Sequence, residues 1–187
     1  AGQDVTSVPA YRRDTGMVFQ RYALFPHMSL GDNVGYGLKM LGLPKAEIKK
    51  RVDNAAEILG LTEYLDRKPA ALSGGQRQRL AIARALLIDP ELLILDDALS
   101  AVDAETESRI LSNLHADRHQ KTTIIAAHRL SSVMQADEIL VLDAGGIAER
   151  GTHDELMAQD GWYRQMFDRQ ALETKVQQGR RDDDENN

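Results

Sequence analysis

The chain has 187 residues, of which 42% are hydrophobic and 28% charged, with a formal net charge of -6 at pH 7. This composition predicts one principal globular core and excludes wholesale disorder. The acidic balance argues against a broad phosphate-backbone footprint, so no nucleic-acid partner is expected, and the absence of cysteine excludes disulfides and thiolate chemistry.

Charged residues interrupt the longest apolar region, so no membrane-spanning helix is predicted. The interrupting residues are Arg84, Asp89, Glu91 and Asp96. No amino-terminal signal peptide is recognised. A protein of this kind is expected to serve a membrane only from outside the bilayer.

The first third of the chain predicts a strand followed by helices. Residues 16–20, GMVFQ, are typical of a short buried strand that ends in a polar side chain. The segment FPHMSLGDNVGYGL then leads from a loop into a helix. Between Pro44 and Leu61, apolar residues recur at helical spacing, and Gly60 is placed to end that helix.

The rest of the chain alternates helices with apolar runs. A buried helix is predicted from Ser73 to Ile88 and another from Ala104 to His119. Apolar runs lie at 92–95, 123–127 and 139–142, and their alternation with helices predicts a parallel sheet. DAGGIAERG predicts a hairpin, THDE at 152–155 is a capping box that opens a helix, and the polar residues 177–187 predict a disordered tail.

The stretch LLILDDALSAVD, residues 92–103, carries the first chemical signal. Four apolar residues run directly into the adjacent carboxylates Asp96 and Asp97. A buried parallel strand delivers such side chains to its carboxyl end, where α/β proteins place their ligands. A magnesium-bound phosphate is therefore the predicted ligand.

Five motifs in order resemble the nucleotide-binding domain of ATP-binding cassette (ABC) transporters. They are Gln20, LSGGQ at 72–76, LLILDD at 92–97, SAVD at 100–103 and AAHRL at 126–130. The resemblance implies an α/β fold with a mostly parallel sheet flanked by helices, similar to P-loop NTPases but truncated. It also implies a partial domain over residues 1–176, with a helical subdomain at about 28–88.

The resemblance implies ATP and Mg²⁺ as cofactors and gives four residues roles in the reaction. Asp96 resembles the residue that binds Mg²⁺, and Asp97 occupies the position of the base that orients or deprotonates the attacking water. Gln20 resembles the residue that completes the magnesium and water shell and reports it to the membrane partner. His128 resembles the histidine that hydrogen-bonds the terminal phosphate.

Ser73, Gly74, Gly75 and Gln76 resemble a phosphate clamp at a helix amino terminus, where backbone N–H groups attract an anion. In the family this clamp closes over ATP held by the opposite subunit. The implied partner is a second nucleotide-binding domain in a head-to-tail homo- or heterodimer. Asp103 and Ser100 would lie along the same interface.

Each motif also has a plainer interpretation. S-G-G alone is commonly a loop with a helix cap, LLIL an ordinary core strand, and Asp97 an ordinary carboxylate at a strand end. His128 alone would more often be structural. The remaining histidines lack metal-ligand spacing and are predicted to be surface or loop residues; they are His27, His115, His119 and His153.

The chain departs from the family pattern at two points. No G-x-x-x-x-G-K-[ST] motif occurs, because no glycine is followed by lysine. The chain therefore resembles an amino-terminally truncated domain that should not hydrolyse ATP alone. Asp97 is one methylene shorter than the usual glutamate, which retracts the carboxylate by roughly 1 Å and can cost about a hundredfold in rate.

These departures leave several functions open. The leading one is an ABC ATPase domain that couples ATP binding and hydrolysis to transmembrane subunits, at the cytoplasmic face of the membrane. The alternatives are a non-catalytic module that donates LSGGQ to a partner ATPase, an inactive α/β fragment, and a soluble ABC ATPase of DNA repair or translation. Phe25, Met28 and Tyr36 are equally interpretable as a groove for the membrane subunit or as core residues.

The two halves of the chain resemble different branches of the family. Residues 17–52 are similar to importers, whereas the sequence from LLILDDALSAVD onward is similar to exporters. The seam would lie between about Pro69 and Pro90. The solute and the direction of transport therefore do not follow from either half.

Overall fold

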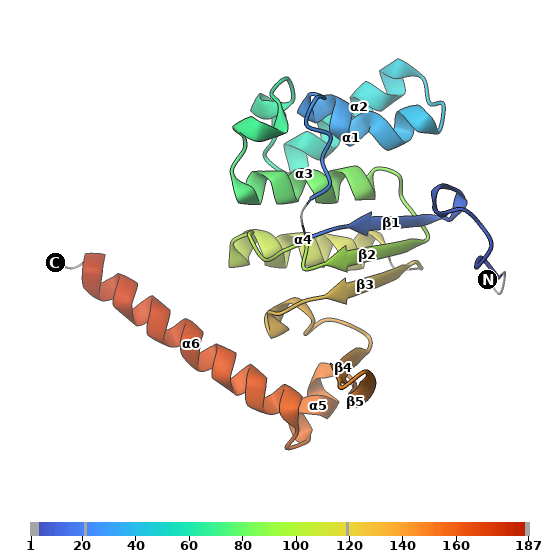
Figure 1. Cartoon of the computed structure of the whole chain (residues 1–187). Helices are drawn as coiled ribbons and strands as arrows, with labels where there is room; N and C mark the ends of the chain where they lie inside the picture. The colour runs from blue at the N-terminus through green and yellow to red at the C-terminus, as the bar shows by residue number, and fades with distance from the viewer. Residues whose placement is uncertain (1–3, 21, 119, 186–187) are drawn as a thin grey trace. The chain divides into compact units, whose positions relative to one another are not determined.

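The computed structural model describes residues 4–20, 22–118 and 120–185, and it divides into two compact units, Ala1–Ala126 and Ala127–Asn187 (Figure 1). Each unit has its own hydrophobic core. The units are described separately below.

A parallel sheet of three strands forms the centre of the first unit. The strands are β1 (Thr15–Val18), β2 (Leu92–Asp96) and β3 (Thr122–Ala126), in the order β1-β2-β3. Val18 pairs with Leu95, and Leu95 with Ile125. Long helical crossovers join the strands, as parallel pairing requires. The predicted parallel sheet and its first three strands are confirmed.

One face of this sheet is packed and the other is more open. Val18, Leu93 and Leu95 are at most 1% exposed and belong to the main core. On the other face, Met17, Ile94 and Ile124 are in register across the three strands, and Met17 and Ile124 are 39% and 49% exposed. The alternation follows from the two-residue period of a strand.

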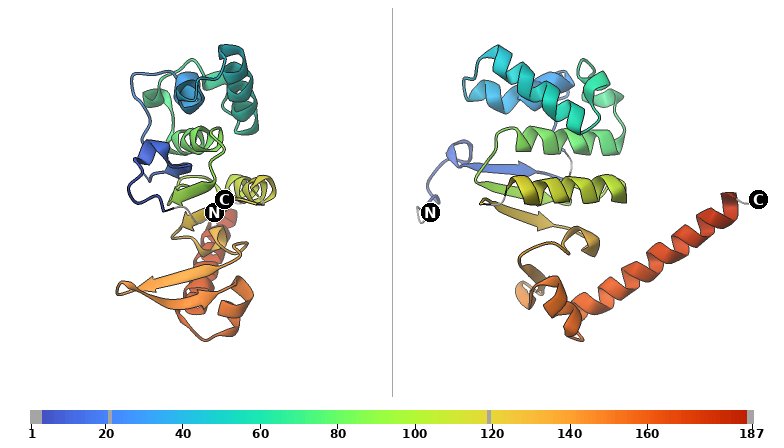
Figure 2. Two further views of the ribbon diagram at one scale, coloured as in Figure 1. Left: turned by 90° about the vertical axis from the view of Figure 1, so that its right-hand side faces the viewer. Right: turned by 180° about the vertical axis from the view of Figure 1, so that it is seen from behind.

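Four helices belong to the first unit. They are α1 (Leu30–Met40), α2 (Lys45–Ile58), α3 (Gly74–Leu86) and α4 (Ala104–Asp117), accompanied by the 3₁₀ turns Ala10–Arg12, Thr62–Tyr64 and Pro69–Ala71. Helix α3 packs against both β1 and α1, so it lies between the sheet and the α1–α2 pair (Figures 1 and 2). The predicted helices are confirmed, although His119, the predicted end of α4, lies outside the described residues.

Local sequence signals set the ends of these helices. Ser29 caps α1 by accepting a hydrogen bond from the Asp32 N–H, at 3.1 Å. Helix α2 follows Pro44 and ends before Gly60, whose φ of 63° lies in the left-handed region that glycine tolerates. Proline before the first turn and glycine after the last give α2 the boundaries expected from its sequence.

The second unit contains an antiparallel hairpin, β4 (Ile139–Asp143) and β5 (Gly146–Gly151). The hairpin prediction is confirmed, but the expectation that residues 139–142 join the parallel sheet is wrong for the described residues, where β4 pairs with β5 alone. The turn residues Ala144 and Gly145 have φ values of 46° and 82°, a conformation that reverses the chain at once. The nearest partner for β4 is therefore β5.

The other elements of this unit are the 3₁₀ turn Leu130–Ser132, α5 (His153–Ala158) and α6 (Trp162–Glu185). The predicted capping box at Thr152 opens α5. His153 is not the surface or loop residue that the sequence predicts. It is the first residue of α5, its ring is half-buried beside Tyr163 and Phe167, and its Nδ1 lies 2.9 Å from the Tyr163 hydroxyl.

Helix α6 continues to Glu185, residues 186–187 lie outside the described residues, and the predicted disorder of residues 177–187 stays a prediction. The limits of the domain and of the helical subdomain remain predictions. No helix in the described ranges combines the length and apolar character needed to cross a bilayer.

Candidate functional site

The paired carboxylates lie where the sequence predicts them, at the carboxyl end of β2. Asp96 is the last residue of the strand and is partly exposed. Asp97 turns the chain with a φ of 47°, and its N–H donates to the Ala126 carbonyl at 2.9 Å. A non-glycine residue in the left-handed region is held there by its surroundings, and such positions are frequent at functional sites.

Gln20 lies against Asp97. Its Nε2 donates to Asp97 Oδ2 at 3.2 Å, although 77 positions separate the two residues. β1 ends at Val18 and is the parallel neighbour of β2, so the residues that follow both strands emerge at one edge of the sheet. The structure thus brings together two of the residues that the sequence selects.

Residues 73–76, called here the signature turn, form the partly exposed amino end of α3. Ser73 is exposed; its Oγ accepts from the Gln76 N–H at 3.3 Å, and Gln76 Oε1 accepts from the Ser73 N–H at 2.9 Å. The first turn contains no acidic residue. The Ser73 hydroxyl can still donate its proton, so the cap and an anion can use the same side chain.

The two glycines of the signature turn have different surroundings. A methyl group on Gly75 would lie 2.8 Å from the backbone oxygen of Ala101, which is closer than real contacts allow. On Gly74 the nearest atom would be the Tyr22 hydroxyl, at an ordinary 3.9 Å. Gly75 is therefore required for the close approach of α3 to residues 97–103, called here the Asp97 loop.

Two further predicted residues, Ser100 and Asp103, lie in the Asp97 loop. Ser100 Oγ donates to the Asp97 carbonyl at 3.0 Å. Asp103 caps α4 by accepting from the Thr106 N–H at 2.8 Å, and this bond lowers the pKa of the exposed Asp103 carboxyl. Both residues have local structural roles, and their place in a dimer interface remains a prediction.

Sequence reasoning missed Gln78, which joins α3 to the Asp97 loop. Gln78 is fully buried; its Nε2 donates to the Asp97 carbonyl at 3.2 Å, and its Oε1 accepts from the Ala101 N–H at 2.8 Å. The available signal was its spacing with Ile82 and Ala85, which places an amide on the apolar side of the helix. A polar group buried there needs partners.

His128 belongs to the second unit, and its side chain is exposed. Its backbone carbonyl accepts from Gln170 Nε2 of α6 at 2.9 Å. Its role beside a terminal phosphate remains a prediction.

Phe25, Met28 and Tyr36 are half-buried. The rings of Phe25 and Tyr36 lie 4.7 Å apart, centroid to centroid. Beneath them the fully buried Asn33 accepts from the Phe25 N–H at 2.8 Å and donates to the Phe25 carbonyl at 3.0 Å. These residues are part of the packing, and their use as a docking groove remains a prediction.

The residues at the end of β2 fit a shared Mg²⁺ site. Within the described ranges, no group of three or more histidine or acidic side chains could hold a metal ion alone. Mg²⁺ is usually held by one or two carboxylates together with substrate phosphates and water, however. Asp96, Asp97 and the Gln20 amide offer such a partial set of oxygen ligands.

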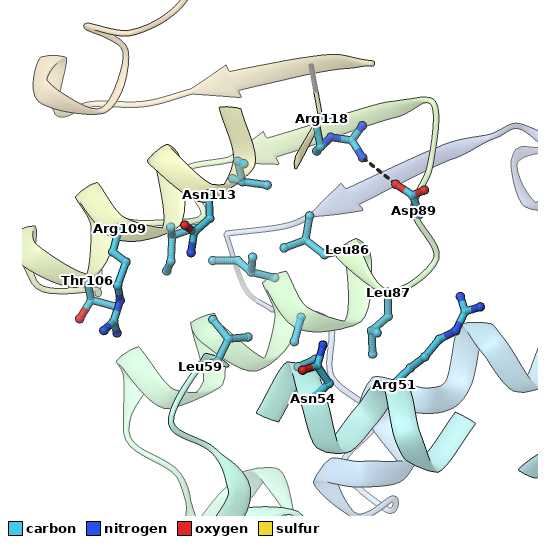
Figure 3. Close-up of a pocket in the computed structure, with 15 residues that line it drawn as sticks. Arg51, Asn54, Leu59, Leu86, Leu87, Asp89, Thr106, Arg109, Asn113 and Arg118 are labelled. Carbon is cyan, nitrogen blue, oxygen red and sulfur yellow. Dashed lines mark ion pairs between the residues drawn. The ribbon is translucent and has the colours of Figure 1, made fainter. Parts of the chain in front are cut away.

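A separate hollow of about 320 Å³ lies between α2, α3 and α4 (Figure 3). Its lining includes Leu86, Leu87, Ile110 and Leu114, and Arg118 lies at one end with its Nη1 3.7 Å from Asp89 Oδ1. None of the residues selected from the sequence lines it. It is therefore distinct from the site at the end of β2.

Comparison with known sequences adds family information to this geometry. The family model for ABC transporters matches residues 1–100. The chain is 45% identical over 159 residues to the sulfate/thiosulfate import ATP-binding protein CysA of Nocardia farcinica, covering 83% of this chain and 48% of that protein. It is 58% identical over 120 residues to the probable multidrug resistance ABC transporter ATP-binding/permease protein YheI of Bacillus subtilis. This match covers 64% of this chain and 20% of that protein.

The chain therefore spans less than half the length of these two relatives. One is named for import and the other for multidrug resistance, so sequences of both kinds are similar to it. The position of a seam between the two branches remains a prediction.

Solved structures agree with the sequence matches. A bacterial Atm1-family ABC exporter with ATP bound superposes with a TM-score of 0.74 at 38% identity, covering 84% of this chain and 28% of that one. The ATP-binding cassette MJ0796, a dimer in a post-hydrolysis state with ADP and Pi, superposes with a TM-score of 0.70 at 28% identity. The match covers 76% of this chain and 64% of that one. The α/β fold with a parallel sheet and flanking helices is thus the fold of ABC ATPase domains.

Proposed function

Because the chain belongs to the ABC transporter family, we propose that it is the larger part of an ATPase domain that couples ATP binding and hydrolysis to the movement of transmembrane subunits. The observation that carries this proposal is the signature turn, which is partly exposed, capped and free of acidic residues at the amino end of a largely buried helix. Such a terminus attracts the phosphates of a nucleotide.

The proposed partner is a second nucleotide-binding domain, arranged head to tail. An exposed anion-binding turn is suited to a nucleotide that another subunit presents. The dimeric structure of MJ0796 supports this arrangement, since that ATP-binding cassette is similar to the chain. Ser100 and Asp103, which are both exposed, would lie at the contact.

In the assembled site Asp96 and Gln20 would hold Mg²⁺, which when bound neutralises charge on the phosphates. Asp97 would orient the attacking water, held in place by the bonds from Gln20 and Ser100. His128 would position the terminal phosphate. Because the Asp97 side chain is short, the hydrolysis that it supports is expected to be slow.

The chain alone is proposed to be inactive, since its printed sequence contains no P-loop motif to hold the β- and γ-phosphates. The second candidate function follows from the same residues. Asp97 replaces the usual glutamate, while LSGGQ is intact and its Ser73 is exposed. This combination favours a non-catalytic module that completes the active site of a partner ATPase.

The proposed location is the cytoplasmic face of the membrane, where the domain would be peripheral and bound to transmembrane transporter subunits. Phe25, Met28 and Tyr36 are the proposed contact for a helix of such a subunit. Nucleic acid is not a proposed partner. The similarity to CysA and YheI, both named as transport proteins, favours transport over the ABC ATPases of DNA repair or translation.

A mixing experiment tests the proposal. ATPase activity is measured for the chain alone, for a P-loop-bearing ABC domain alone, and for both together. The chain alone is expected to show no turnover but to raise the activity of the other domain, and Ser73→Arg should remove the gain. Thr152→Arg is the control, because it alters the similar cap of α5. Turnover by the chain alone that depends on Asp96 would disprove the proposed inactivity.

A further inference from the structure

The segment that follows Gln20 is strained. Tyr22 and Ala23 have φ values of 64° and 43°, and neither is glycine. Two successive residues in the left-handed region are unfavourable for L-amino acids and persist only when neighbouring groups hold them. Residues 22–25 therefore need an external support.

Arg84 of α3 provides that support. Its Nη1 donates to the Ala23 carbonyl at 2.6 Å, and its Nη2 donates to the Tyr22 carbonyl at 3.3 Å. The guanidinium carbon also lies 5.5 Å from the centre of the Phe25 ring. Burial lowers the pKa of Arg84, as expected for a partly buried guanidinium. The planar fork of arginine is suited to two adjacent carbonyls.

The strained segment is fixed at both of its ends. Before it, Gln20 donates to Asp97. After it, the Phe25 N–H and carbonyl are both hydrogen-bonded to Asn33 of α1. Residues 22 and 23 therefore lie, along the chain, between the Gln20–Asp97 contact and the Phe25–Asn33 contact.

The same helix also begins with the signature turn. The Tyr22 hydroxyl lies 3.9 Å from the position of a methyl group on Gly74, while the Tyr22 carbonyl is bonded to Arg84. The Tyr22 hydroxyl thus lies near the start of α3, while the Tyr22 carbonyl is bonded to Arg84 near the end of that helix. A shift of the signature turn along the helix axis would move the support of the Gln20 segment as well.

From these contacts we infer that Arg84 is a positioning residue, which holds the Tyr22–Ala23 turn so that Gln20 stays against Asp97 and moves together with the signature turn. The inference deepens the proposed function and rests on it for the effect on activity. The contact itself can be tested without any activity.

The first experiment measures hydrogen–deuterium exchange across the full chain. Arg84→Lys keeps the charge but cannot span both carbonyls, so the Tyr22 and Phe25 amides should exchange about tenfold faster or more. Arg79→Lys is the matched control, because Arg79 of the same helix donates to the Leu59 carbonyl at 3.0 Å. It should accelerate exchange near Leu59 and leave residues 22–25 unchanged. Equal acceleration of residues 22–25 by both variants would overturn the inference.

A rescue variant separates local support from general destabilisation. Glycine relieves the strain of a positive φ, so Ala23→Gly added to Arg84→Lys should restore much of the protection of Phe25. A global loss of stability would not be corrected at this position. If the double variant exchanges as fast as Arg84→Lys throughout residues 22–25, the inference is wrong.

The second experiment measures ATPase activity in the mixture of the chain with a P-loop-bearing domain. In this mixture the turnover site combines the other domain's P-loop with the signature turn of the chain, so Arg84→Lys should lower kcat several-fold through that turn, with little change in the KM for ATP. A kcat equal to that of the wild-type mixture would show that Arg84 does not link the Gln20 segment to the signature turn. If the wild-type mixture shows no stimulation, the proposed function fails, while the exchange experiment still decides the role of Arg84.

Discussion

The amino ends of α3 and α5 are built from the same pair of hydrogen bonds but differ in charge and in backbone access. In α3 the partners are Ser73 and Gln76, and in α5 they are Thr152 and Glu155. In both, the first side chain accepts from a backbone N–H while the second accepts from the N–H of the capping residue. The two helices therefore begin with equivalent caps.

The residues between the capping partners differ. The first turn of α5 contains Asp154 and Glu155, whereas that of α3 contains two glycines and no acid. Carboxylates compensate the positive end of the helix dipole in α5, and in α3 this end remains available. A capping box alone thus does not distinguish a structural turn from an anion site. The charge and size of the residues within the turn distinguish the two.

The largest expected effect comes from giving α3 the charge of α5. Gly74→Asp adds a carboxylate at a position with space for it, and the domain should remain folded. The stimulation of a P-loop-bearing domain should fall by at least about tenfold, because the new charge repels the phosphates. Gly74→Asn, of equal size and without charge, should retain much more of the stimulation. Equal losses for the two variants would show that charge does not explain the difference between the helices.

The next effect concerns the close contact of α3. Gly75→Ala should lower the free energy of unfolding by about 1–3 kcal/mol, because the new methyl group would overlap the Ala101 carbonyl. Gly74→Ala is the control and should be neutral or slightly stabilising. Urea denaturation followed by circular dichroism measures both. A Gly75→Ala variant as stable as Gly74→Ala would show that the two glycines are structurally equivalent.

A smaller effect is expected from removing the capping side chain of each helix. Ser73→Ala and Thr152→Ala should each cost about 1 kcal/mol of stability, since each removes one capping acceptor. Only Ser73→Ala should also weaken the stimulation of the partner ATPase. Parallel stability and activity measurements test this separation, and a similar loss of activity in both variants would contradict it.

The smallest effect is a difference in pH dependence. The bond from the Thr152 N–H lowers the pKa of Glu155, so its stabilising contribution is present above the ordinary glutamate value of about 4.3 and is lost as the pH falls through the lowered value. Gln76 does not titrate. In acid the Thr152 amide should therefore lose protection relative to the Ser73 amide, after correction for intrinsic exchange. A ratio of Thr152 to Ser73 amide protection that stays constant from pH 5 to pH 2.5 would contradict this prediction.

The sequence predicts most of the fold, because its helices and strands carry strong local signals. Pro44, Gly60 and the capping box at Thr152 mark boundaries that the structure confirms. The pairing of β4 could not be obtained from its apolar run, since a run of this length is compatible with either kind of sheet and the following turn decides. Likewise, the partial burial of the His153 ring depends on Tyr163 and Phe167, which approach it only in the folded unit.

The site follows a similar pattern. The motifs select Gln20 and Asp97, and the structure shows them in contact. The supports of these residues, Gln78 and Arg84, could not be selected in the same way, because their partners are backbone groups distant in the sequence. A sequence motif specifies side chains, so it does not show which backbone carbonyl a side chain will bond. Residues that act by bonding the main chain become visible only when the fold is known.

The bond pattern of Gln78 limits the chemistry that this position can accept. One carboxamide faces the oxygen of Asp97 and the N–H of Ala101 at the same time. Hydrolysis of that amide to a carboxylate, the slow ageing reaction of glutamine, would replace the donating NH2 group by an oxygen. This oxygen would face the Asp97 carbonyl oxygen, and neither could donate a hydrogen bond. Loss of ammonia from Gln78, a mass increase of about 1 Da in its peptide, should therefore loosen the contact between α3 and the Asp97 loop.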